Sequence, residues 1–384
     1  MRLAIITSHP IQYNAPLFRQ LSLYNGHEIK VFYTWGERVL KDKFDPGFNK
    51  KIEWDVLLLE GYEYEFLENI SKEPGSHHFT GINNPDLIER IKQWKAEAII
   101  VYGWAFKSHF KVMKYFKGKI PILFRGDSTL LDNNPGIKSI ARKIALRYVY
   151  HYADKALFVG KANKNYFQAH GFSDKNLVFV PHAVDNNRFV PNAKNISGGK
   201  AMREQFNIPP DAIVFLFAGK LEEKKAPSLL ASAFISANLP KSHLVITGNG
   251  KLEAQIKECY SEVKNIHFLD FQNQSLMPGL YQIGDVFVLP SSGPGETWGL
   301  AINEAMAAGL AIICSDKCGA AADLVKTGVN GYIFKAGNAN ELATMMKTLT
   351  RETIENMGKE SQGIIKDWSV EKASEAIRNL LDKR

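Results

Sequence analysis

The sequence lacks several features that would each point to a particular class of protein. None of its apolar runs reaches the roughly 18–20 residues that cross a bilayer. Its opening, MRLAIITSHP, has no small-residue cleavage site and indicates a β-strand rather than a secretory signal. The three cysteines, Cys259, Cys314 and Cys318, neither pair evenly nor accompany histidines at metal-ligand spacing, which favours reduced thiols in a cytoplasmic protein. Asp-x-Asp occurs nowhere, so the carboxylate pattern that commonly holds a divalent metal against a diphosphate is missing.

Acidic residues are scarce in one stretch of the first half. The segment from Lys107 to Lys164 contains 13 basic and 3 acidic residues, whereas residues 191–384 contain 21 of each. A cationic surface fits an anionic partner, and it equally fits a solvated face with no partner. No recognised nucleic-acid motif accompanies the segment, so nucleic-acid binding is not expected.

Short apolar strands alternate with helical patterns in both halves of the chain. Strands are predicted at 3–8, 28–34, 98–102, 121–125, 155–159 and 177–180, and again at 212–218, 243–247, 266–269, 286–290 and 311–315. Such strands are typical of parallel sheets covered on both faces, so we expect an α/β protein with two Rossmann-like, doubly wound domains facing a cleft. Their expected bounds are 1–186 and 211–365. A polar linker over 187–210 joins them, and a helical segment, 366–384, packs back on the first domain.

The stretch PGETWGLAINEAMAAG carries two glutamates. Glu296 lies in a Gly/Pro/Ser loop after a strand, and a helix of small residues is predicted from Leu300 with Thr297 as its N-cap. The N–H groups that begin such a helix are a ready phosphate site. Glu304 lies about two turns further on, where a buried carboxylate needs hydrogen-bond donors such as ribose or sugar hydroxyls. Alternatively, Glu296 complements the helix dipole and Glu304 pairs with a structural Lys or Arg.

Two more loops follow predicted strands in the same half. GKLEEKK places Lys220 and Lys225 at the carboxyl end of a strand, where two ammonium groups can bracket a pyrophosphate. The same run also suits a solvated, lysine-rich surface. TGNGKLE places Asn249 and Gly250 in a tight turn, but Glu253 stands where a dinucleotide fingerprint has its third glycine, which argues against a nicotinamide enzyme.

Together these motifs resemble the C-terminal half of the retaining glycosyltransferases of family 4, which have the GT-B architecture and include enzymes of bacterial surface-polysaccharide synthesis. The resemblance rests on GKLEEKK, TGNGKLE, PGETWGLAINEAMAAGLAIICSD and GVNGYIF, in the family's order, and it covers about residues 180–340. The pair of glutamates eight positions apart is the family's hallmark. The first half matches in outline only, and PHAVDNNRF stands where the family usually has a proline-asparagine-glycine-valine-aspartate run.

The resemblance implies a role for each matching position. Glu296 would contact hydroxyls of the donor sugar, and Glu304 would hold the ribose hydroxyls. Lys220, which stands where the family often has arginine, and Lys225 would neutralise the pyrophosphate and help it leave. The other donor-binding positions would be Thr297, Trp298, Gly299, Leu300, Asn249, Gly250, Phe271 and Gln272. No metal ion and no cofactor is expected, since the nucleotide-sugar is a substrate.

The first half departs from the family's pattern. The family usually has a histidine after a strand of the first domain, and here that run reads PILFRGD. Asp127, or less favourably Arg125, would replace it as a catalytic or sugar contact. His9 and Asn14, after the first strand, are further acceptor-side candidates, although a histidine beside proline at a strand end is more often structural. His182, in PHAVD, is expected to be a linker residue and not a catalyst.

The resemblance therefore implies transfer of a sugar, with retained anomeric configuration, to a saccharide or lipid-pyrophosphate-linked acceptor. UDP is the preferred nucleotide of the donor and GDP the second choice. Alternatives are an epimerase or a phosphorylase of the same architecture, although no clear pyridoxal lysine serves the latter, and a non-catalytic nucleotide-sugar binder. With the basic segment 107–164, the prediction is a cytoplasmic protein held peripherally on the inner face of the cell membrane.

Overall fold

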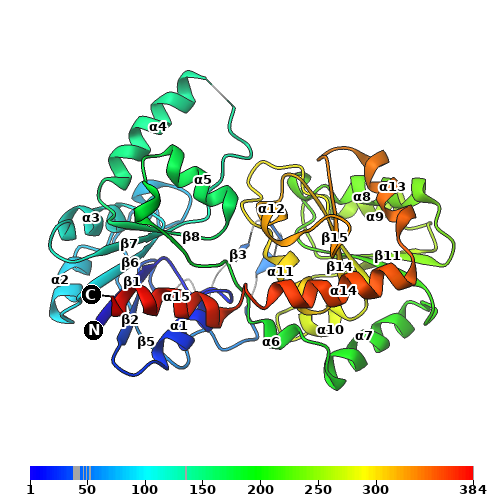
Figure 1. The fold of residues 1–384 in the computed structure, drawn as a ribbon, viewed down its shortest axis with the longest axis horizontal. Helices are drawn as coiled ribbons and strands as arrows, with labels where there is room; N and C mark the ends of the chain where they lie inside the picture. The colour runs from blue at the N-terminus through cyan, green and yellow to red at the C-terminus, as the bar shows by residue number, and fades with distance from the viewer. Residues whose placement is uncertain (38–43, 46, 49, 52, 135, 384) are drawn as a thin grey trace. The chain divides into compact units, whose positions relative to one another are not determined.

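The computed structural model describes the chain except for residues 38–43, 46, 49, 52, 135 and 384. The chain forms two compact units (Figure 1). The first comprises Met1–Lys43, Leu57–His182 and Val370–Arg384, and the second comprises Phe44–Val56 and Ala183–Ser369. A short piece of the first half therefore belongs to the second unit, which the strand pattern does not predict.

The first unit is built on a parallel sheet of seven strands in the order β5-β2-β1-β6-β7-β8-β9. The strands are β1 (Arg2–Thr7), β2 (Glu28–Tyr33), β5 (Glu63–Phe66), β6 (Ala98–Tyr102), β7 (Ile122–Arg125), β8 (Lys155–Phe158) and β9 (Leu177–Phe179). Its α-helices are α1 (Ala15–Ser22), α2 (Leu87–Gln93), α3 (Lys107–Phe116), α4 (Ile137–Tyr150), α5 (Lys161–Ala169) and α15 (Val370–Asp382), with 3₁₀ turns η2 (Phe79–Gly81) and η3 (Asp174–Asn176). Helix α15 packs on α1, where the Tyr24 hydroxyl lies 3.0 Å from Ser374 Oγ.

The second unit repeats this plan with six parallel strands in the order β12-β11-β10-β13-β14-β15. They are β10 (Ile213–Ala218), β11 (Ser242–Thr247), β12 (Ile266–Leu269), β13 (Val286–Leu289), β14 (Ala311–Ser315) and β15 (Gly331–Phe334). The helices are α6 (Asn186–Phe189), α7 (Ala193–Gln205), η4 (Glu223–Lys225), α8 (Pro227–Ala237), α9 (Glu253–Tyr260), α10 (Met277–Tyr281), α11 (Leu300–Ala307), α12 (Ala321–Leu324), α13 (Ala339–Thr348) and α14 (Arg351–Ile365). A short antiparallel pair, β3 (Phe44–Asp45) and β4 (Lys50–Lys51), completes it.

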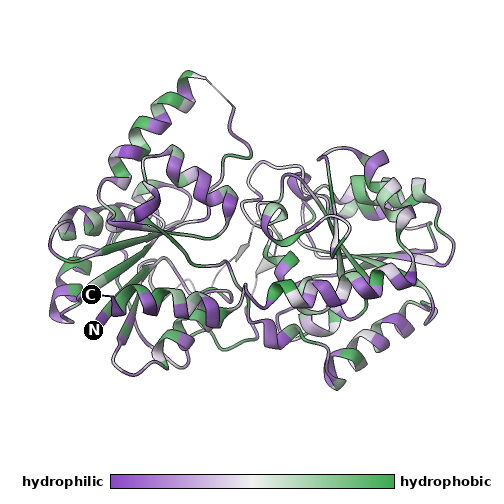
Figure 2. Ribbon diagram, in the orientation of Figure 1, coloured by the Kyte–Doolittle hydropathy of each residue, from purple (hydrophilic) through white to green (hydrophobic). Residues whose placement is uncertain are grey.

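Both sheets bury apolar strands, and hydrophobic residues are concentrated in the strands of each unit (Figure 2). In the second unit the chain runs outward from β10 through β11 to β12, and then returns to the other side of β10 at β13. The carboxyl ends of β10 and β13 therefore flank a point where the strand order reverses, which is where open α/β sheets bind ligands. Two Rossmann-like parallel domains are present, as the strand pattern predicts.

The segment 187–210, where a linker is expected, belongs to the second unit and contains most of α6 and all of α7. Two of its residues, Asn192 and Gly199, serve helix capping and packing. Asn192 caps α7 by accepting a hydrogen bond from the N–H of Asn195 at 3.0 Å. Gly199 lies so near α10 that a Cβ atom there would come within 2.5 Å of the backbone of Gln282. A larger residue would push α7 away from α10.

Among the residues that the structure describes, no helix is both long and apolar enough to cross a bilayer. All three cysteines are free thiols, with Cys314 and Cys318 buried and Cys259 exposed.

Candidate functional site

The predicted donor-side residues of the second unit follow neighbouring strands. Because β12, β11, β10 and β13 are adjacent and parallel, the loops after them meet at one edge of the sheet. These loops carry Phe271 and Gln272 after β12, Asn249 and Gly250 after β11, Lys220 after β10, and Ser291 and Glu296 after β13. The sequence motifs are thus brought together by topology alone.

Glu296 is held by two donors of the protein itself. Its Oε2 accepts hydrogen bonds from the Lys225 ammonium and from Ser291 Oγ, the latter at 2.8 Å. The Glu296 side chain is 8% exposed and that of Lys225 is 17% exposed, so this is a largely buried ion pair. Lys225, expected at a pyrophosphate, therefore binds Glu296 in this structure. Ser291 is a partner that the sequence motifs do not indicate.

Helix α11 begins at Leu300, as predicted, but its N-cap is Gly299 and not Thr297. Gly299 adopts φ = +96°, a left-handed conformation that glycine adopts without steric cost. The loop before Gly299 packs closely against the loop that contains Gly319. A Cβ atom added at Gly319 would come within 1.7 Å of the Thr297 carbonyl oxygen, so the approach requires glycine. The N–H of Ala320 also donates to the Trp298 carbonyl at 2.9 Å.

The Trp298 side chain points into the protein. Its indole N–H donates to Asn303 Oδ1 at 2.8 Å, and its ring lies 5.2 Å from that of Trp368. Trp298 is almost fully buried. A ligand at the start of α11 would therefore meet the backbone of Trp298 and not its indole.

Glu304 is buried in α11 and accepts a hydrogen bond from the Tyr281 hydroxyl at 2.7 Å. Tyr281 ends α10 and is itself buried, so the carboxylate is fixed by a neighbouring helix. The sequence motifs do not reveal this partner, because Tyr281 lies in an apolar stretch without a distinguishing pattern. The Tyr281 hydroxyl thereby fixes the orientation of the Glu304 carboxylate through its Oε2 atom.

Asn249 ties three loops together. Its Oδ1 accepts from the N–H of Phe271 at 2.8 Å, and its backbone carbonyl accepts from the N–H of Leu221 at 3.0 Å. A Cβ at Gly250 would come within 2.5 Å of the Leu221 carbonyl oxygen, so glycine is needed for this approach. Asn249 thus fixes the backbone of the loops that follow β10 and β12.

An aromatic group from 44–56 lies beside these loops. The Phe48 ring is 4.8 Å from that of Phe271, and Trp54 is 6.3 Å from Phe271. The Lys220 ammonium lies 5.0 Å from the centre of the Phe48 ring, at cation–π distance. Nothing in the sequence pattern indicates this group, since Phe48 is remote along the chain from every motif.

In the first unit, the Arg125 side chain is held by backbone carbonyls of its own unit. Its guanidinium is buried and donates to the carbonyls of Val180 and Pro181 at 3.0 and 3.2 Å. Burial lowers the pKa of Arg125. The side chain therefore ties the end of β7 to the segment after β9.

Asp127 lines a cavity of about 280 Å³ with Trp104, Tyr150 and Arg142. It follows β7, while His9 follows β1 and Asn14 precedes α1. His9 Nδ1 lies 2.9 Å from Ser8 Oγ and its ring packs edge-on against Trp35 at 5.1 Å. Asn14 makes no side-chain capping bond to α1. Of these candidates, Asp127 is the one that lines a cavity described here.

His182 is the residue at which the chain leaves the first unit for the second, and it interacts electrostatically with Arg125 and Asp127. Burial, and then the Arg125 charge, lower the pKa of His182 to about 4, against a raising influence of Asp127. The imidazole of His182 is therefore neutral near pH 7. Its position three residues after β9 is the sequence signal that places it at this edge.

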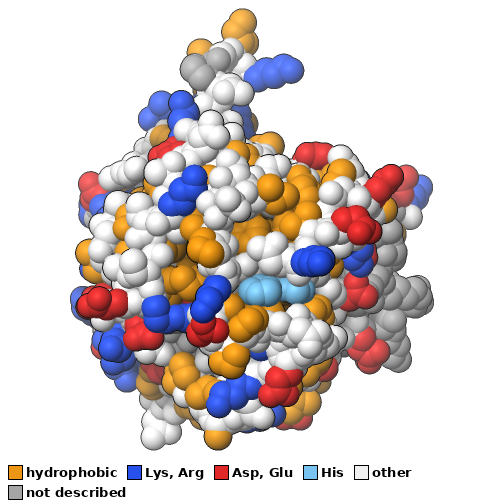
Figure 3. All heavy atoms as spheres, turned by 90° about the vertical axis from the view of Figure 1, so that its right-hand side faces the viewer, with side chains coloured by type: hydrophobic (Ala, Val, Ile, Leu, Met, Phe, Trp, Pro, Cys, Tyr) orange, Lys and Arg blue, Asp and Glu red, His pale blue; other side chains and the backbone are white. Residues whose placement is uncertain are grey.

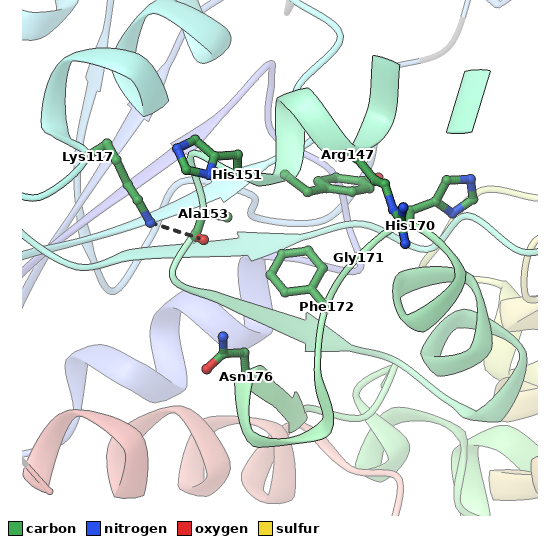
Figure 4. Close-up of a pocket in the computed structure, with 9 residues that line it drawn as sticks. Lys117, Arg147, His151, Ala153, His170, Gly171, Phe172 and Asn176 are labelled. Carbon is green, nitrogen blue, oxygen red and sulfur yellow. Dashed lines mark hydrogen bonds between the residues drawn. The ribbon is translucent and has the colours of Figure 1, made fainter. Parts of the chain in front are cut away.

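A second cavity of the first unit, of about 410 Å³, is lined by Lys117, Arg147, His151 and His170 among others (Figure 4). The Lys117 ammonium donates to the Ala153 carbonyl at 3.5 Å and pairs with Asp154. None of the predicted site residues lines this cavity.

Most of the second unit is similar to a known protein family. Residues 199–366 match the family model described as glycosyl transferases group 1. The matched range contains Lys220, Lys225, Glu296 and Glu304, so the match includes the motif residues of the second unit.

The relatives found by sequence are sugar transferases. The chain is 26% identical over 241 residues to the sulfoquinovosyl transferase SQD2 of Arabidopsis thaliana, covering 61% of this chain and 45% of that protein. It is 28% identical over 194 residues to the D-inositol 3-phosphate glycosyltransferase of Geodermatophilus obscurus, covering 47% and 41%. It is 32% identical over 143 residues to the lipopolysaccharide 1,2-N-acetylglucosaminetransferase of Salmonella typhimurium, covering 34% and 37%. The matches span less than half of each relative.

Solved structures resemble the whole chain. Anabaena HepE, in complex with UDP and glucose, matches with a TM-score of 0.71 at 18% identity over 100% of both chains. WaaG, a glycosyltransferase involved in lipopolysaccharide biosynthesis, matches with a TM-score of 0.65 at 13% identity over 98% of this chain and 99% of that one. At these identities the likeness concerns the fold, and it confirms the predicted GT-B type.

Proposed function

We propose that the protein is a retaining glycosyltransferase of the family 4 type, which moves a sugar from a nucleotide-sugar to a saccharide or lipid-linked saccharide in polysaccharide biosynthesis. UDP-sugars are the preferred donors and GDP-sugars the second choice. The observation that carries the proposal is the pair of buried glutamates, Glu296 and Glu304, at the carboxyl edge of the second sheet, each oriented by a donor of its own. Buried carboxylates so oriented are suited to accept hydrogen bonds from a polyol.

The donor would bind with its ribose hydroxyls on Glu304 and its sugar hydroxyls on Glu296. The base would lie near the loop of Phe271 and Gln272, and the N–H groups of 297–300 would face the sugar and phosphates. A helix N-terminus reached over glycines favours an anion, and α11 begins directly after Gly299.

The departing diphosphate would be stabilised by charge fixed in the protein. Lys220 stands at the end of β10, and the Lys225 ammonium has three N–H donors. It can keep its bond to Glu296 and still direct another donor toward a phosphate oxygen. Preorganised positive charge of this kind stabilises the developing oxyanion, and we propose that it serves without a divalent metal ion.

The reaction would proceed on one face of the sugar. The acceptor hydroxyl oxygen forms a bond to the anomeric carbon as the bond from that carbon to the β-phosphate oxygen breaks, and the hydroxyl proton passes to the leaving diphosphate. Asp127, beside His182, would contact the acceptor. A membrane-surface location, through the basic segment 107–164, would bring a lipid-linked acceptor within reach.

The test is turnover with a panel of UDP- and GDP-sugars, with and without lipid-linked acceptors. We expect acceptor-dependent release of the nucleoside diphosphate and a product with the donor's anomeric configuration. Inverted configuration would contradict retention, and loss of activity with EDTA that Mg²⁺ restores would contradict the metal-free step. Conversion of the nucleotide-sugar without acceptor and without release of diphosphate would favour an epimerase. Tight nucleotide binding without turnover on any pair would favour a non-catalytic binder.

A further inference from the structure

Helix α4 of the first unit has an exposed apolar face. It contacts the unit mainly through its last turn, where Leu146, Val149 and Tyr150 are buried. Ahead of that turn, large side chains stand in solvent: Ile137 is 87% exposed, Ile140 is 61% exposed and Ile144 is 66% exposed. The helix projects away from the rest of its unit (Figure 1), and hydrophobic and basic side chains gather on this projection at the top of Figure 3.

The exposed side chains form one stripe. At about 100° per residue, Ile137, Ile140, Ile144 and Tyr148 fall within about a third of the helix circumference, opposite Leu146. Tyr148 is 54% exposed and continues the stripe toward Tyr152 and Phe110, whose ring centres lie 5.4 and 6.2 Å from its own. An apolar stripe that ends in tyrosines is typical of a helix that lies in a bilayer interface.

Lys138 lies to one side of the stripe and Lys143 and Arg147 lie to the other, whereas Arg142 lies on the opposite face of the helix, near Leu146. Helix α4 carries four basic residues and no acidic one, and the basic residues are Lys138, Arg142, Lys143 and Arg147. Arg147 also lines the basic cavity of Figure 4. Long basic side chains beside an apolar stripe can reach lipid phosphates while the stripe enters the acyl region. A second copy of this chain would instead set these cations against one another, which disfavours a symmetric helix pair.

We propose that α4 docks the protein on an anionic lipid bilayer by inserting the stripe of Ile137, Ile140, Ile144 and Tyr148. This docking would deliver a lipid-linked acceptor to the protein, and in that respect it rests on the proposed function. Arg142 and Leu146 of α4 line the cavity that contains Asp127. The inserted helix therefore forms part of the wall of the acceptor-side cavity, and Arg142 supplies a cation for the acceptor's phosphate groups.

The experiment is flotation of the full chain with vesicles of phosphatidylcholine, with and without phosphatidylglycerol. The test variant combines Ile140→Ser and Ile144→Ser. The matched control combines Ile196→Ser and Ile235→Ser, two isoleucines of the second unit that are 39% and 44% exposed. We expect wild type and control to float with the anionic vesicles, and the test variant to partition about tenfold more weakly for each isoleucine replaced. Added salt should weaken wild-type flotation without abolishing it, because insertion of apolar groups is not screened.

Equal flotation of the test variant and wild type would overturn the proposal, as would the failure of wild type to float. Concentration-dependent dimerisation that the test variant loses, without vesicle binding, would assign the stripe to a second copy instead. UDP binding is measured on the same samples. Loss of flotation with UDP binding intact shows that the stripe and not the fold was altered, whereas intact flotation without any UDP binding would contradict the proposed function alone.

Discussion

The buried ion pair of Lys225 and Glu296 makes a quantitative prediction about stability. In Lys225→Met, the Glu296 carboxylate, at 8% exposure, loses its charged partner and keeps only the Ser291 hydroxyl. Stranding a buried charge costs about 3–5 kcal/mol of unfolding free energy, which lowers Tm by about 10 °C for a domain of this size. Glu296→Gln should cost less, about 1–3 kcal/mol, since the amide still accepts from Ser291 and Lys225 can turn to water.

The decisive quantity is the coupling in the double variant. Lys225→Met with Glu296→Gln removes both charges, so its loss should fall short of the sum of the single losses by about 1–3 kcal/mol. Urea unfolding of the four proteins measures it. The matched control is the exposed pair of Lys241 and Asp211, whose side chains are 75% and 64% exposed at 2.9 Å and should couple by less than about 1 kcal/mol. Losses at Lys225 and Glu296 that simply add would refute the buried-pair reasoning.

Two further predictions concern a close approach and a buried histidine. Gly319→Ala should displace the Thr297 loop and lower both Tm and UDP affinity, whereas Gly363→Ala, where a Cβ meets nothing within 4 Å, should leave both unchanged or raise Tm slightly; equal effects in calorimetry would contradict this. Burial lowers the pKa of His109 to about 4 from 6.5. The unfolded chain alone takes up this proton, so stability is lost as pH falls from about 6.5 toward 4, by about 1.3 kcal/mol between pH 7.5 and 5.5. In His109→Gln, urea unfolding should show a pH dependence smaller by that amount, and an unchanged dependence would contradict the assignment.

Motifs that follow strands are readable from the sequence because topology alone brings them together. The loops of Lys220, Asn249 and Glu296 each follow a recognisable apolar strand, and adjacent parallel strands set them at one edge. The sequence does not show which side chains in these loops bind one another. That the Lys225 ammonium binds Glu296 depends on the detailed path of two loops, which no spacing rule encodes.

Composition misleads where glycine serves packing. The run of Asn, Gly and Pro in 187–210 suggests a linker, yet Gly199 is there because α7 lies against the backbone of Gln282. Likewise, Phe48 reaches Phe271 although one belongs to the first half of the sequence and the other to the second. Contacts between distant segments require the fold itself, and periodicity within a short window carries no information about them.

The proposed donor site is tested most directly by calorimetric titration of UDP and GDP without added metal. The titrated proteins are wild type, Glu304→Gln and Tyr281→Phe, with Glu355→Gln on α14 as an exposed control. We expect micromolar binding of one nucleotide, UDP by preference. Hydrogen bonds to a charged carboxylate contribute about 1.5–3 kcal/mol, so Glu304→Gln should weaken binding by about 10- to 150-fold. Tyr281→Phe should weaken it less, and Glu355→Gln not at all. Binding of neither nucleotide by wild type, or equal binding by wild type and Glu304→Gln, would contradict the assignment of this edge of the sheet as a nucleotide-sugar site.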